Sequence, residues 1–217
     1  MNRRAFIEAN TGWIAPPHTP EIKLRLATEL YSIWRMSEDD LAEMGVPPPY
    51  WAFAWAGGQA VARYLLDNPT TVRGLSVLDA GSGSGLCAIA AAMTGARDVI
   101  ASDIDAYAVE AISMNATGAG VRVTATGRDM IGADDGWDVV MIGDLFYEQP
   151  LARDVEAWGR RLAARGALVL AGDPGRTYLP KSGLTALATY EVQTTRELED
   201  REVRRTTVYR MDAEPAL

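Results

Sequence analysis

The residues best placed to do chemistry lie in a glycine-rich stretch that follows an apolar run. Val77-Leu78-Asp79-Ala80 has the composition of a buried strand, and Gly81-Ser82-Gly83-Ser84-Gly85 separates it from a helical run at Leu86 to Thr94. Glycines let the backbone adopt positive φ and let a ligand approach the main chain, while the first N–H groups of the helix point at that ligand. The stretch therefore predicts a cofactor-binding turn; the alternative is a strand-to-helix turn without a ligand.

The spacing of these glycines indicates the class of cofactor. A dinucleotide-binding turn has the pattern Gly-x-Gly-x-x-Gly, whereas this chain has Gly-x-Gly-x-Gly, with Asp79 two residues before it. That pattern resembles motif I of the class I methyltransferases, which bind S-adenosylmethionine (AdoMet). The resemblance implies AdoMet as the cofactor, S-adenosylhomocysteine as its product, and cofactor binding by Asp79, Gly81 and Gly83.

A second acidic residue follows the next predicted strand. Asp103 ends the stretch Val99-Ile100-Ala101-Ser102-Asp103, about eighteen residues beyond Gly85, where nucleotide-binding βαβ units carry a ribose-binding carboxylate. A carboxylate can accept hydrogen bonds from both ribose hydroxyls, which selects an adenosine without requiring a phosphate. We predict that Asp103 binds the ribose; Asp105 is the competing candidate and is predicted to cap the following helix.

The predicted fourth strand ends in a group suited to hold an amine. Asp144-Leu145-Phe146-Tyr147 follows it, where many enzymes that methylate planar nitrogens carry Asn/Asp-Pro-Pro-Tyr/Phe. The Asp-x-x-Tyr pattern instead resembles the signature of the seven-strand protein lysine methyltransferases. Deprotonating a lysine at neutral pH costs roughly 4 to 5 kcal/mol, and burial beside a sulfonium lowers that cost.

In this interpretation Asp144 is a catalytic residue that accepts an amine N–H bond and aims the lone pair. Tyr147, also predicted to be catalytic, and Phe146 would line the lysine channel and favour a methylated ammonium by cation–π contact. The alternative is that Asp144 caps the next helix and that the aromatic rings pack in the core.

The alternation of strands and helices from Val72 onward predicts an α/β fold with a doubly wound, mostly parallel sheet. Ala188 to Glu197 and Glu202 to Met211 alternate polar and apolar residues about a turn at Glu199-Asp200, which predicts an antiparallel hairpin. The predicted strands lie near 75–79, 97–103, 120–126, 137–143 and 166–172, and the predicted helices near 85–95, 105–117 and 150–164.

The first 70 residues are predicted to form a helical extension that ends in a tryptophan-rich segment. Ile22, Leu26, Leu30 and Ile33 recur at helical spacing and predict a helix from Glu21 to Met36. Ser37-Glu38-Asp39-Asp40 predicts the cap of a short helix ending before Gly45, and Pro47-Pro48-Pro49 predicts an extended segment before a helix that runs to about Leu66. We therefore expect one domain over residues 1–217, with the extension at 1–70 and the AdoMet-binding core at 71–217.

Composition limits the partners and the setting. The net charge is −8 and the sequence pI is about 4.7, which argues against nucleic acid and favours a cationic partner such as a lysine-bearing protein, or serves solubility alone. Cys87 is predicted to be a small buried residue and His18 a loop residue, so no metal site is expected. No apolar segment approaches the roughly 20 residues of a transmembrane helix, and the residues after Met1 resemble neither a signal nor a transit peptide.

Five segments together resemble the electron transfer flavoprotein β-subunit lysine methyltransferases. The resemblance runs from about residue 20 to the C-terminal strand and implies a seven-stranded sheet with an antiparallel C-terminal strand, and a protein-lysine N-methyltransferase acting on that flavoprotein subunit. The segments are Pro49 to Ala60, the glycine-rich stretch, Ala101 to Asp105, Gly143 to Tyr147, and Gly172-Asp173-Pro174-Gly175-Arg176.

The resemblance also implies roles for single residues. Trp55 would lie against the cofactor, Gly81 and Gly83 would contact its methionine part, and Gly143 would line the site at the fourth strand. Asp129 is placed to accept a hydrogen bond from the adenine amino group; the alternative is that Asp129 is an exposed loop residue with no role in binding. Trp51 is expected in the core, and Asp173 and Arg176 either form a tight turn or contact the substrate.

Three classes of function remain open. The first is the protein-lysine methyltransferase, acting on the flavoprotein β subunit or on another lysine-rich protein such as a ribosomal protein. The second is a small-molecule N-methyltransferase, which would have an enclosed apolar acceptor pocket. The third is a non-catalytic AdoMet-binding module, against which Asp144 and Tyr147 argue. We expect a monomeric, bacterial-type cytoplasmic enzyme without nucleic-acid or membrane partners.

Overall fold

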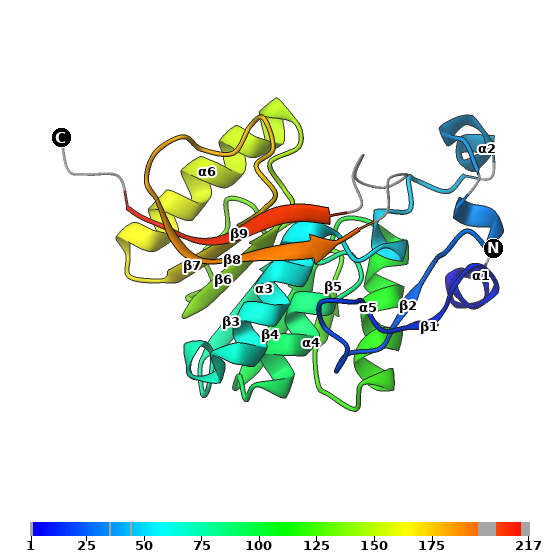
Figure 1. The fold of residues 1–217 in the computed structure, drawn as a ribbon, viewed down its shortest axis with the longest axis horizontal. Helices are drawn as coiled ribbons and strands as arrows, with labels where there is room; N and C mark the ends of the chain where they lie inside the picture. The colour runs from blue at the N-terminus through cyan, green and yellow to red at the C-terminus, as the bar shows by residue number, and fades with distance from the viewer. Residues whose placement is uncertain (1, 35, 44, 195–202, 214–217) are drawn as a thin grey trace.

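The computed structural model describes residues 2–34, 36–43, 45–194 and 203–213. Figure 1 shows a central sheet flanked by helices, with the N-terminal elements gathered at one end. Among the described residues, no helix combines the length and the apolar character needed to cross a membrane.

Seven strands form the central sheet, in the order β5-β4-β3-β6-β7-β9-β8. The five strands from β3 to β7 pair in parallel, and β9 is antiparallel to both β7 and β8. This confirms the predicted doubly wound, mostly parallel sheet with an antiparallel C-terminal strand. The strands are β3 (Ser76–Ala80), β4 (Asp98–Ser102), β5 (Thr124–Thr126), β6 (Val139–Gly143), β7 (Leu168–Asp173), β8 (Leu184–Gln193) and β9 (Val203–Met211).

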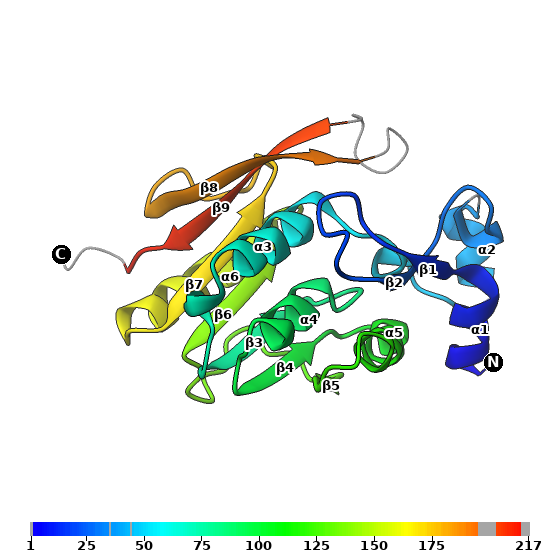
Figure 2. The same cartoon turned by 60° about the horizontal axis from the view of Figure 1, so that its bottom comes forward.

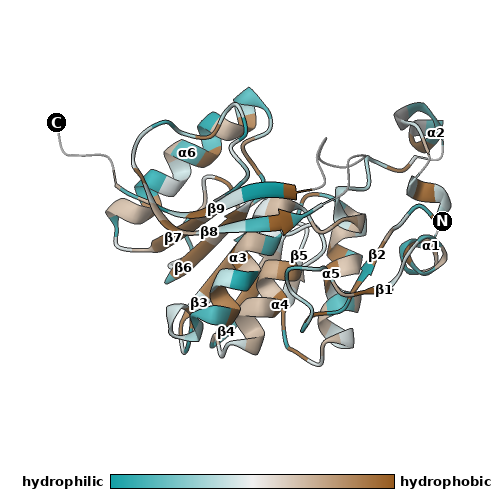
Figure 3. Ribbon diagram, in the orientation of Figure 1, coloured by the Kyte–Doolittle hydropathy of each residue, from teal (hydrophilic) through white to brown (hydrophobic). Residues whose placement is uncertain are grey.

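Helices cover both faces of the sheet because its strands are apolar on both sides. Val77 of β3 packs into a cluster with α3 (Ala56–Asp67), α4 (Leu86–Met93) and α5 (Ala106–Gly118). Its neighbour Leu78 points to the other face and packs into a cluster with α6 (Gln149–Ala164). The alternation follows from the two-residue period of a strand, and Figure 3 shows the hydrophobic colour concentrated on the central strands.

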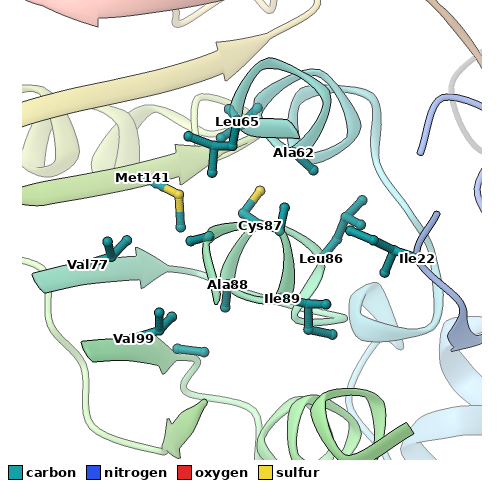
Figure 4. Close-up of a cluster of buried hydrophobic side chains, with 14 of the residues drawn as sticks. Ile22, Ala62, Leu65, Val77, Leu86, Cys87, Ala88, Ile89, Val99 and Met141 are labelled. Carbon is teal, nitrogen blue, oxygen red and sulfur yellow. The ribbon is translucent and has the colours of Figure 1, made fainter. Parts of the chain in front are cut away.

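Helix α4 is the most apolar element beside the sheet. Cys87, Ala88 and Ile89 are buried, and Figure 4 shows them between the strand residues Val77 and Val99 and the residues of α3. The Cys87 thiol donates to the Gly58 carbonyl oxygen at 3.3 Å. Cys87 is therefore the small buried residue that the sequence predicts.

The N-terminal extension contains more than helices. It comprises α1 (Arg3–Asn10), a two-stranded antiparallel sheet of β1 (Gly12–Ile14) and β2 (Leu24–Leu26), and α2 (Glu38–Glu43). Figure 2 shows α1 and α2 beside each other at the end of the molecule near α5. Their apolar residues, together with Trp51, pack on Tyr107, Ala108 and Ala111 of α5.

The predicted helix from Glu21 to Met36 is wrong. Leu24 and Leu26 are buried in a strand that pairs with β1, and the side-chain oxygen of Asn115 accepts a hydrogen bond from the Arg25 backbone N–H at 2.7 Å. Leu30, which a helical stripe would bury, is 86% exposed. Tertiary pairing therefore overrides the helical spacing of the apolar residues. A 3₁₀ turn at Ser32–Trp34 is the one helical element described between β2 and α2.

Other sequence predictions of local structure are confirmed. The Ser37 hydroxyl donates to the Asp40 carboxylate at 2.7 Å and accepts from the Asp40 backbone N–H at 3.2 Å, which caps α2 as predicted. The C-terminal hairpin is present, with β8 beginning at Leu184 rather than Ala188. Its predicted turn at Glu199-Asp200 lies outside the described residues.

Candidate active site

The glycine-rich stretch joins β3 to α4 and needs its glycines. Gly81, Gly83 and Gly85 have φ values of +63°, +53° and +86°, a region that other L-residues rarely adopt. A Cβ atom at Gly81 would lie 2.7 Å from a methyl carbon of Leu145, whereas one at Gly83 would meet nothing closer than 3.9 Å. The turn is therefore packed against the protein at Gly81 and open above Gly83.

The side chain of Asp79 stabilises this turn. Its side chain is buried, accepts a hydrogen bond from the Ala88 backbone N–H at 3.0 Å, and accepts another from the Ser82 hydroxyl. Burial raises the pKa of Asp79 to about 7, although both hydrogen bonds favour the charged form. Both observed hydrogen bonds of Asp79 are to groups of the protein itself. Its contact with the cofactor stays a prediction.

Asp103 lies at the carboxyl end of β4 and also stabilises the glycine turn. One carboxylate oxygen accepts the Gly83 N–H at 2.9 Å and the other accepts the Asp105 N–H at 3.0 Å. Burial raises the pKa of Asp103, and these two bonds oppose the rise. Asp105 caps α5 by accepting the Tyr107 N–H at 2.8 Å, which confirms its predicted structural role.

A cleft opens over the glycine turn, and the tryptophan-rich segment closes one side of it. We call it the inner cleft; its walls include Trp55, Gly58, Asp79, Gly81, Gly83, Gly143 and Asp144. The cleft thus brings together five of the seven predicted cofactor residues and one predicted catalytic residue. Asp103 borders the turn without lining the cleft.

Tyr50 is a residue of this site that the sequence analysis did not single out. Its carbonyl oxygen accepts the Trp55 indole N–H at 2.8 Å, and its ring lies 6.0 Å from that of Trp55 and 6.2 Å from that of Tyr147. Tyr50 therefore connects Trp55, which lines the inner cleft, to Tyr147. The signal was present in the sequence, because Tyr50 belongs to the same tryptophan-rich segment as Trp55.

Asp144 follows β6 and is held from two directions. One oxygen accepts the Gly58 backbone N–H at 2.9 Å and the other pairs with the Arg176 guanidinium at 2.9 Å. The side chain is 10% exposed, and its backbone φ is +60°. Burial raises the pKa of Asp144, while the charge of Arg176 opposes the rise. The Asp144 carboxylate is therefore a fixed acceptor at the edge of the inner cleft.

Close packing of α3 against the sheet makes this arrangement feasible. A Cβ atom at Gly57 would lie 2.6 Å from a carboxylate oxygen of Asp144, and one at Gly143 would lie 3.2 Å from the Gly58 Cα. Only glycines let the start of α3 approach the ends of β6 and β7 this closely. This close approach lets the Gly58 N–H reach Asp144. The sequence analysis did not single out Gly58.

The turn after β7 brings Arg176 to the site. Asp173 is buried, and one of its oxygens accepts the backbone N–H groups of Gly175 and Arg176, both at 2.6 Å. This confirms the predicted tight turn. The turn points the Arg176 guanidinium at Asp144, a contact that the sequence analysis did not predict.

Tyr147 and Phe146 have different roles. Tyr147 is 46% exposed, but Phe146 is completely buried among core residues of β3, β6 and α6. The prediction that Phe146 lines a lysine channel is therefore wrong, because its position in the core leaves it no surface for a substrate.

A second depression lies on the other side of the Asp144–Arg176 pair. We call it the outer hollow; it has a volume of about 280 Å³ and is lined by Tyr147, Pro174, Gly175, Arg176, Thr177 and Arg204. Asp144 lines the inner cleft and Arg176 lines the outer hollow. The ion pair therefore stands between the two cavities.

The remaining predicted residues lie outside both cavities. Asp129 is exposed and accepts the Ile131 N–H at 2.9 Å, so its contact with adenine stays a prediction. Trp51 is buried and stacks on Tyr107 with ring centroids 6.3 Å apart, which confirms its place in the core. His18 packs edge-on against Tyr190. Within the described part of the chain, no group of three or more His, Cys, Asp or Glu side chains is arranged to hold a metal ion.

Known structures share the fold. Magnesium protoporphyrin IX methyltransferase from Synechocystis, solved with bound SAM, is 21% identical, with a TM-score of 0.53 over 71% of this chain and 78% of that one. Ribosomal protein L11 methylase from Lactobacillus delbrueckii is 19% identical, with a TM-score of 0.50 over 72% of this chain and 79% of that one. These likenesses show a methyltransferase fold.

Sequence comparison is more specific. Residues 63–146 match the family model of ribosomal protein L11 methyltransferase (PrmA). Electron transfer flavoprotein beta subunit lysine methyltransferase from Xenopus laevis is 44% identical over 176 residues, covering 80% of this chain and 70% of that protein. The human protein of that name is 42% identical over 177 residues, with 80% and 66% covered. The chain belongs to the family of electron transfer flavoprotein beta subunit lysine methyltransferases.

Proposed function

We propose that this protein is an AdoMet-dependent protein-lysine N-methyltransferase that acts on the β subunit of electron transfer flavoprotein. The observation that carries the proposal is the position of Asp144, whose carboxylate lines the inner cleft and contacts a residue of the outer hollow. The relatives with 42 to 44% identity and this name support the choice of substrate.

The groups around the glycine turn fit AdoMet. The space above Gly83 is open to a ligand, since a Cβ there would have 3.9 Å of clearance. Each oxygen of Asp103 uses one acceptor site on a backbone N–H, and a carboxylate oxygen has a second site that a ribose hydroxyl can use. Trp55 adds an apolar wall across the inner cleft. Gly81 and Gly83 would contact the methionine part and Asp103 the ribose, while Trp55 would lie against the cofactor and Gly143 would line the site at the end of β6.

When bound there, AdoMet supplies an electrophilic methyl group, which a neutral amine takes while the carbon–sulfur electron pair returns to sulfur. The protein has to bind the lysine side chain, favour its neutral form and aim its lone pair. Asp144 provides a fixed acceptor for an amine N–H, since Gly58 and Arg176 fix its orientation. Tyr147, which lines the outer hollow, and Tyr50, whose ring lies 6.2 Å from that of Tyr147, would pack along the aliphatic stem of the lysine.

The outer hollow favours a protein substrate over a small molecule. A small-molecule N-methyltransferase would enclose its acceptor in an apolar pocket, whereas this hollow is bordered by two arginines, Thr177 and the half-exposed Tyr147. The net charge of −8 favours a cationic partner rather than nucleic acid. We extend the proposal to a monomeric cytoplasmic enzyme.

A lysine-rich ribosomal protein is the second candidate substrate. The match of residues 63–146 to the L11 methyltransferase model supports it, as does the Bacillus pumilus ribosomal protein L11 methyltransferase, which is 29% identical over 144 residues. This chain covers 44% of that relative, so the flavoprotein subunit remains the first choice.

Labelling of a lysate distinguishes these substrates. We expect that the protein and labelled AdoMet, added to a lysate from cells that lack the enzyme, will label the flavoprotein β subunit on lysine. Labelling of a ribosomal protein instead would favour the second candidate. Labelling of small metabolites alone would contradict a protein-lysine methyltransferase.

A further inference from the structure

The ion pair between Asp144 and Arg176 addresses a difficulty in the proposed chemistry. A carboxylate next to a lysine favours the charged ammonium, but methyl transfer requires the neutral amine. An Asp144 carboxylate without a compensating cation would bind the lysine in its unreactive form. A positive charge that stays beside Asp144 therefore helps the reaction, in addition to the charge of the AdoMet sulfonium.

Arg176 supplies that charge from a fixed position. Its backbone N–H is bound by the buried Asp173, and its guanidinium is 2.9 Å from Asp144 with 21% of the side chain exposed. A carboxylate oxygen accepts two hydrogen bonds, so the oxygen that pairs with Arg176 can also accept an amine N–H. The lysine thus has a site on Asp144 without displacing the arginine.

The other titratable groups that act on Asp144 or line the inner cleft are not cations. The titratable and charged side chains that act on Asp144 or line the inner cleft are Arg176 and Asp173 from the turn after β7, Cys87 from α4 and Asp79 from β3. Tyr147 and Arg204 of β9 line the outer hollow beside Arg176. Burial raises the pKa of the Cys87 thiol well above its usual value, so the thiol stays neutral. Arg176 is the cation that contacts Asp144 among the described residues.

We propose that Arg176 is a positioning residue that remains paired with Asp144 while the lysine binds, so that the carboxylate accepts a neutral amine instead of holding an ammonium. This inference rests on the proposed function. It differs from a model in which the lysine displaces Arg176 and the pair acts as a gate. Under the gate model, removing the arginine would help the substrate to bind.

The test is the pH dependence of single-turnover methylation of recombinant electron transfer flavoprotein, with saturating AdoMet. Wild type is compared with Arg176→Gln and Arg176→Lys, and with Arg205→Gln as a control that removes an exposed arginine of β9 outside both cavities. Asp79, whose pKa is about 7, is present in all four proteins. The titration of Asp79 is therefore common to all four profiles.

We expect the midpoint of the Arg176→Gln profile to move up by about one pH unit or more. Activity at neutral pH would then fall about tenfold or more and recover under alkaline conditions. Arg176→Lys keeps the charge and should stay near the wild-type midpoint, and Arg205→Gln should match wild type. AdoMet affinity should be unchanged in each variant.

Two outcomes would overturn the inference. If Arg176→Gln is active and keeps the wild-type midpoint, any loss of activity in this variant comes from a structural effect and not from the missing charge. A lower flavoprotein concentration for half of the maximal single-turnover rate, with an unchanged or faster maximal rate, would support the gate. If Arg176→Gln does not fold, a wild-type midpoint in Arg176→Lys still supports the charge, and a midpoint shifted upward contradicts it. A wild-type enzyme that methylates no lysine would instead contradict the proposed function.

Discussion

The carboxylate of Asp103 accepts a hydrogen bond from the backbone N–H of Gly83 at 2.9 Å. This bond ties the end of β4 to the glycine turn after β3 and fixes the distance between the two parts of the proposed AdoMet site. It also occupies the Gly83 N–H, so at this position the glycine turn contributes space and shape rather than a hydrogen-bond donor for a ligand. Asp103 is therefore both a brace of the turn and the proposed ribose acceptor.

Replacing Asp103 should weaken AdoMet binding. Asp103→Ala removes the acceptor for charge-assisted hydrogen bonds, and we expect a loss of roughly 1.5 to 3 kcal/mol in binding free energy, measured by calorimetry. Asp98→Ala, at the exposed start of the same strand, is the matched control and should bind normally. Unchanged affinity in a folded Asp103→Ala protein would remove Asp103 from the site, and tighter binding of NAD than of AdoMet to wild type would contradict the cofactor.

Replacing Asp144 should reduce the rate of chemistry with little effect on cofactor affinity. Asn is the suitable replacement because the backbone φ of +60° at this position is tolerated by Asn better than by Ala. We expect Asp144→Asn to lower the single-turnover rate by about 10² or more. A rate within a few-fold of wild type would show that Asp144 does not hold the amine.

Replacing Phe146 should affect mainly stability, whereas replacing Tyr147 should affect mainly activity. Phe146→Ala leaves a cavity in the core and should lower the free energy of unfolding by about 3 to 5 kcal/mol. Tyr147→Ala changes a half-exposed side chain and should alter stability by about 0.5 kcal/mol or less, while lowering methyl-transfer activity. Urea denaturation and activity assays on both variants check this contrast; a stable Phe146→Ala protein with impaired catalysis would restore Phe146 to the site.

Asp79 should make stability depend on pH. Its folded pKa of about 7 lies above its ordinary value of 3.8, so the folded protein binds the proton more tightly than the unfolded chain. The resulting stabilisation is complete below about pH 4 and is lost as the pH rises to about 7, by at most ~1.4 kcal/mol per pH unit.

Asp79→Asn removes that titration. Urea denaturation at pH 5 and pH 8 should show a larger loss of stability with rising pH for wild type than for the variant. Parallel losses in the two proteins would mean that Asp79 is charged throughout this range.

Much of the fold and part of the site follow from local sequence. The glycine turn and Asp103 were predictable because each sits directly after an apolar strand, and neighbouring parallel strands end at the same edge of the sheet. The β1–β2 pair was not predictable, since Leu24 and Leu26 alternate over only a few residues and their partner strand lies ten residues earlier in the chain. The exposed Leu30 completed a helical pattern by chance.

The Asp144–Arg176 contact could not be predicted from sequence motifs. Both residues follow strands that prove to be neighbours, with Gly143 opposite Gly172 in the register of β6 and β7. The sequence contained both motifs, but the contact depends on the backbone conformation after each strand. Phe146 was misplaced for a related reason, because the motif does not specify which of two adjacent aromatic side chains faces the core.

The central claim is tested most directly by mass spectrometry of the flavoprotein β subunit. Purified electron transfer flavoprotein, prepared without methylated lysine, is incubated with AdoMet and either wild type or Asp144→Asn. We predict methyl groups on lysines of the β subunit with wild type, and a rate lower by about 10² or more with the variant. No methyllysine with wild type, or equal methylation with Asp144→Asn, would contradict the account.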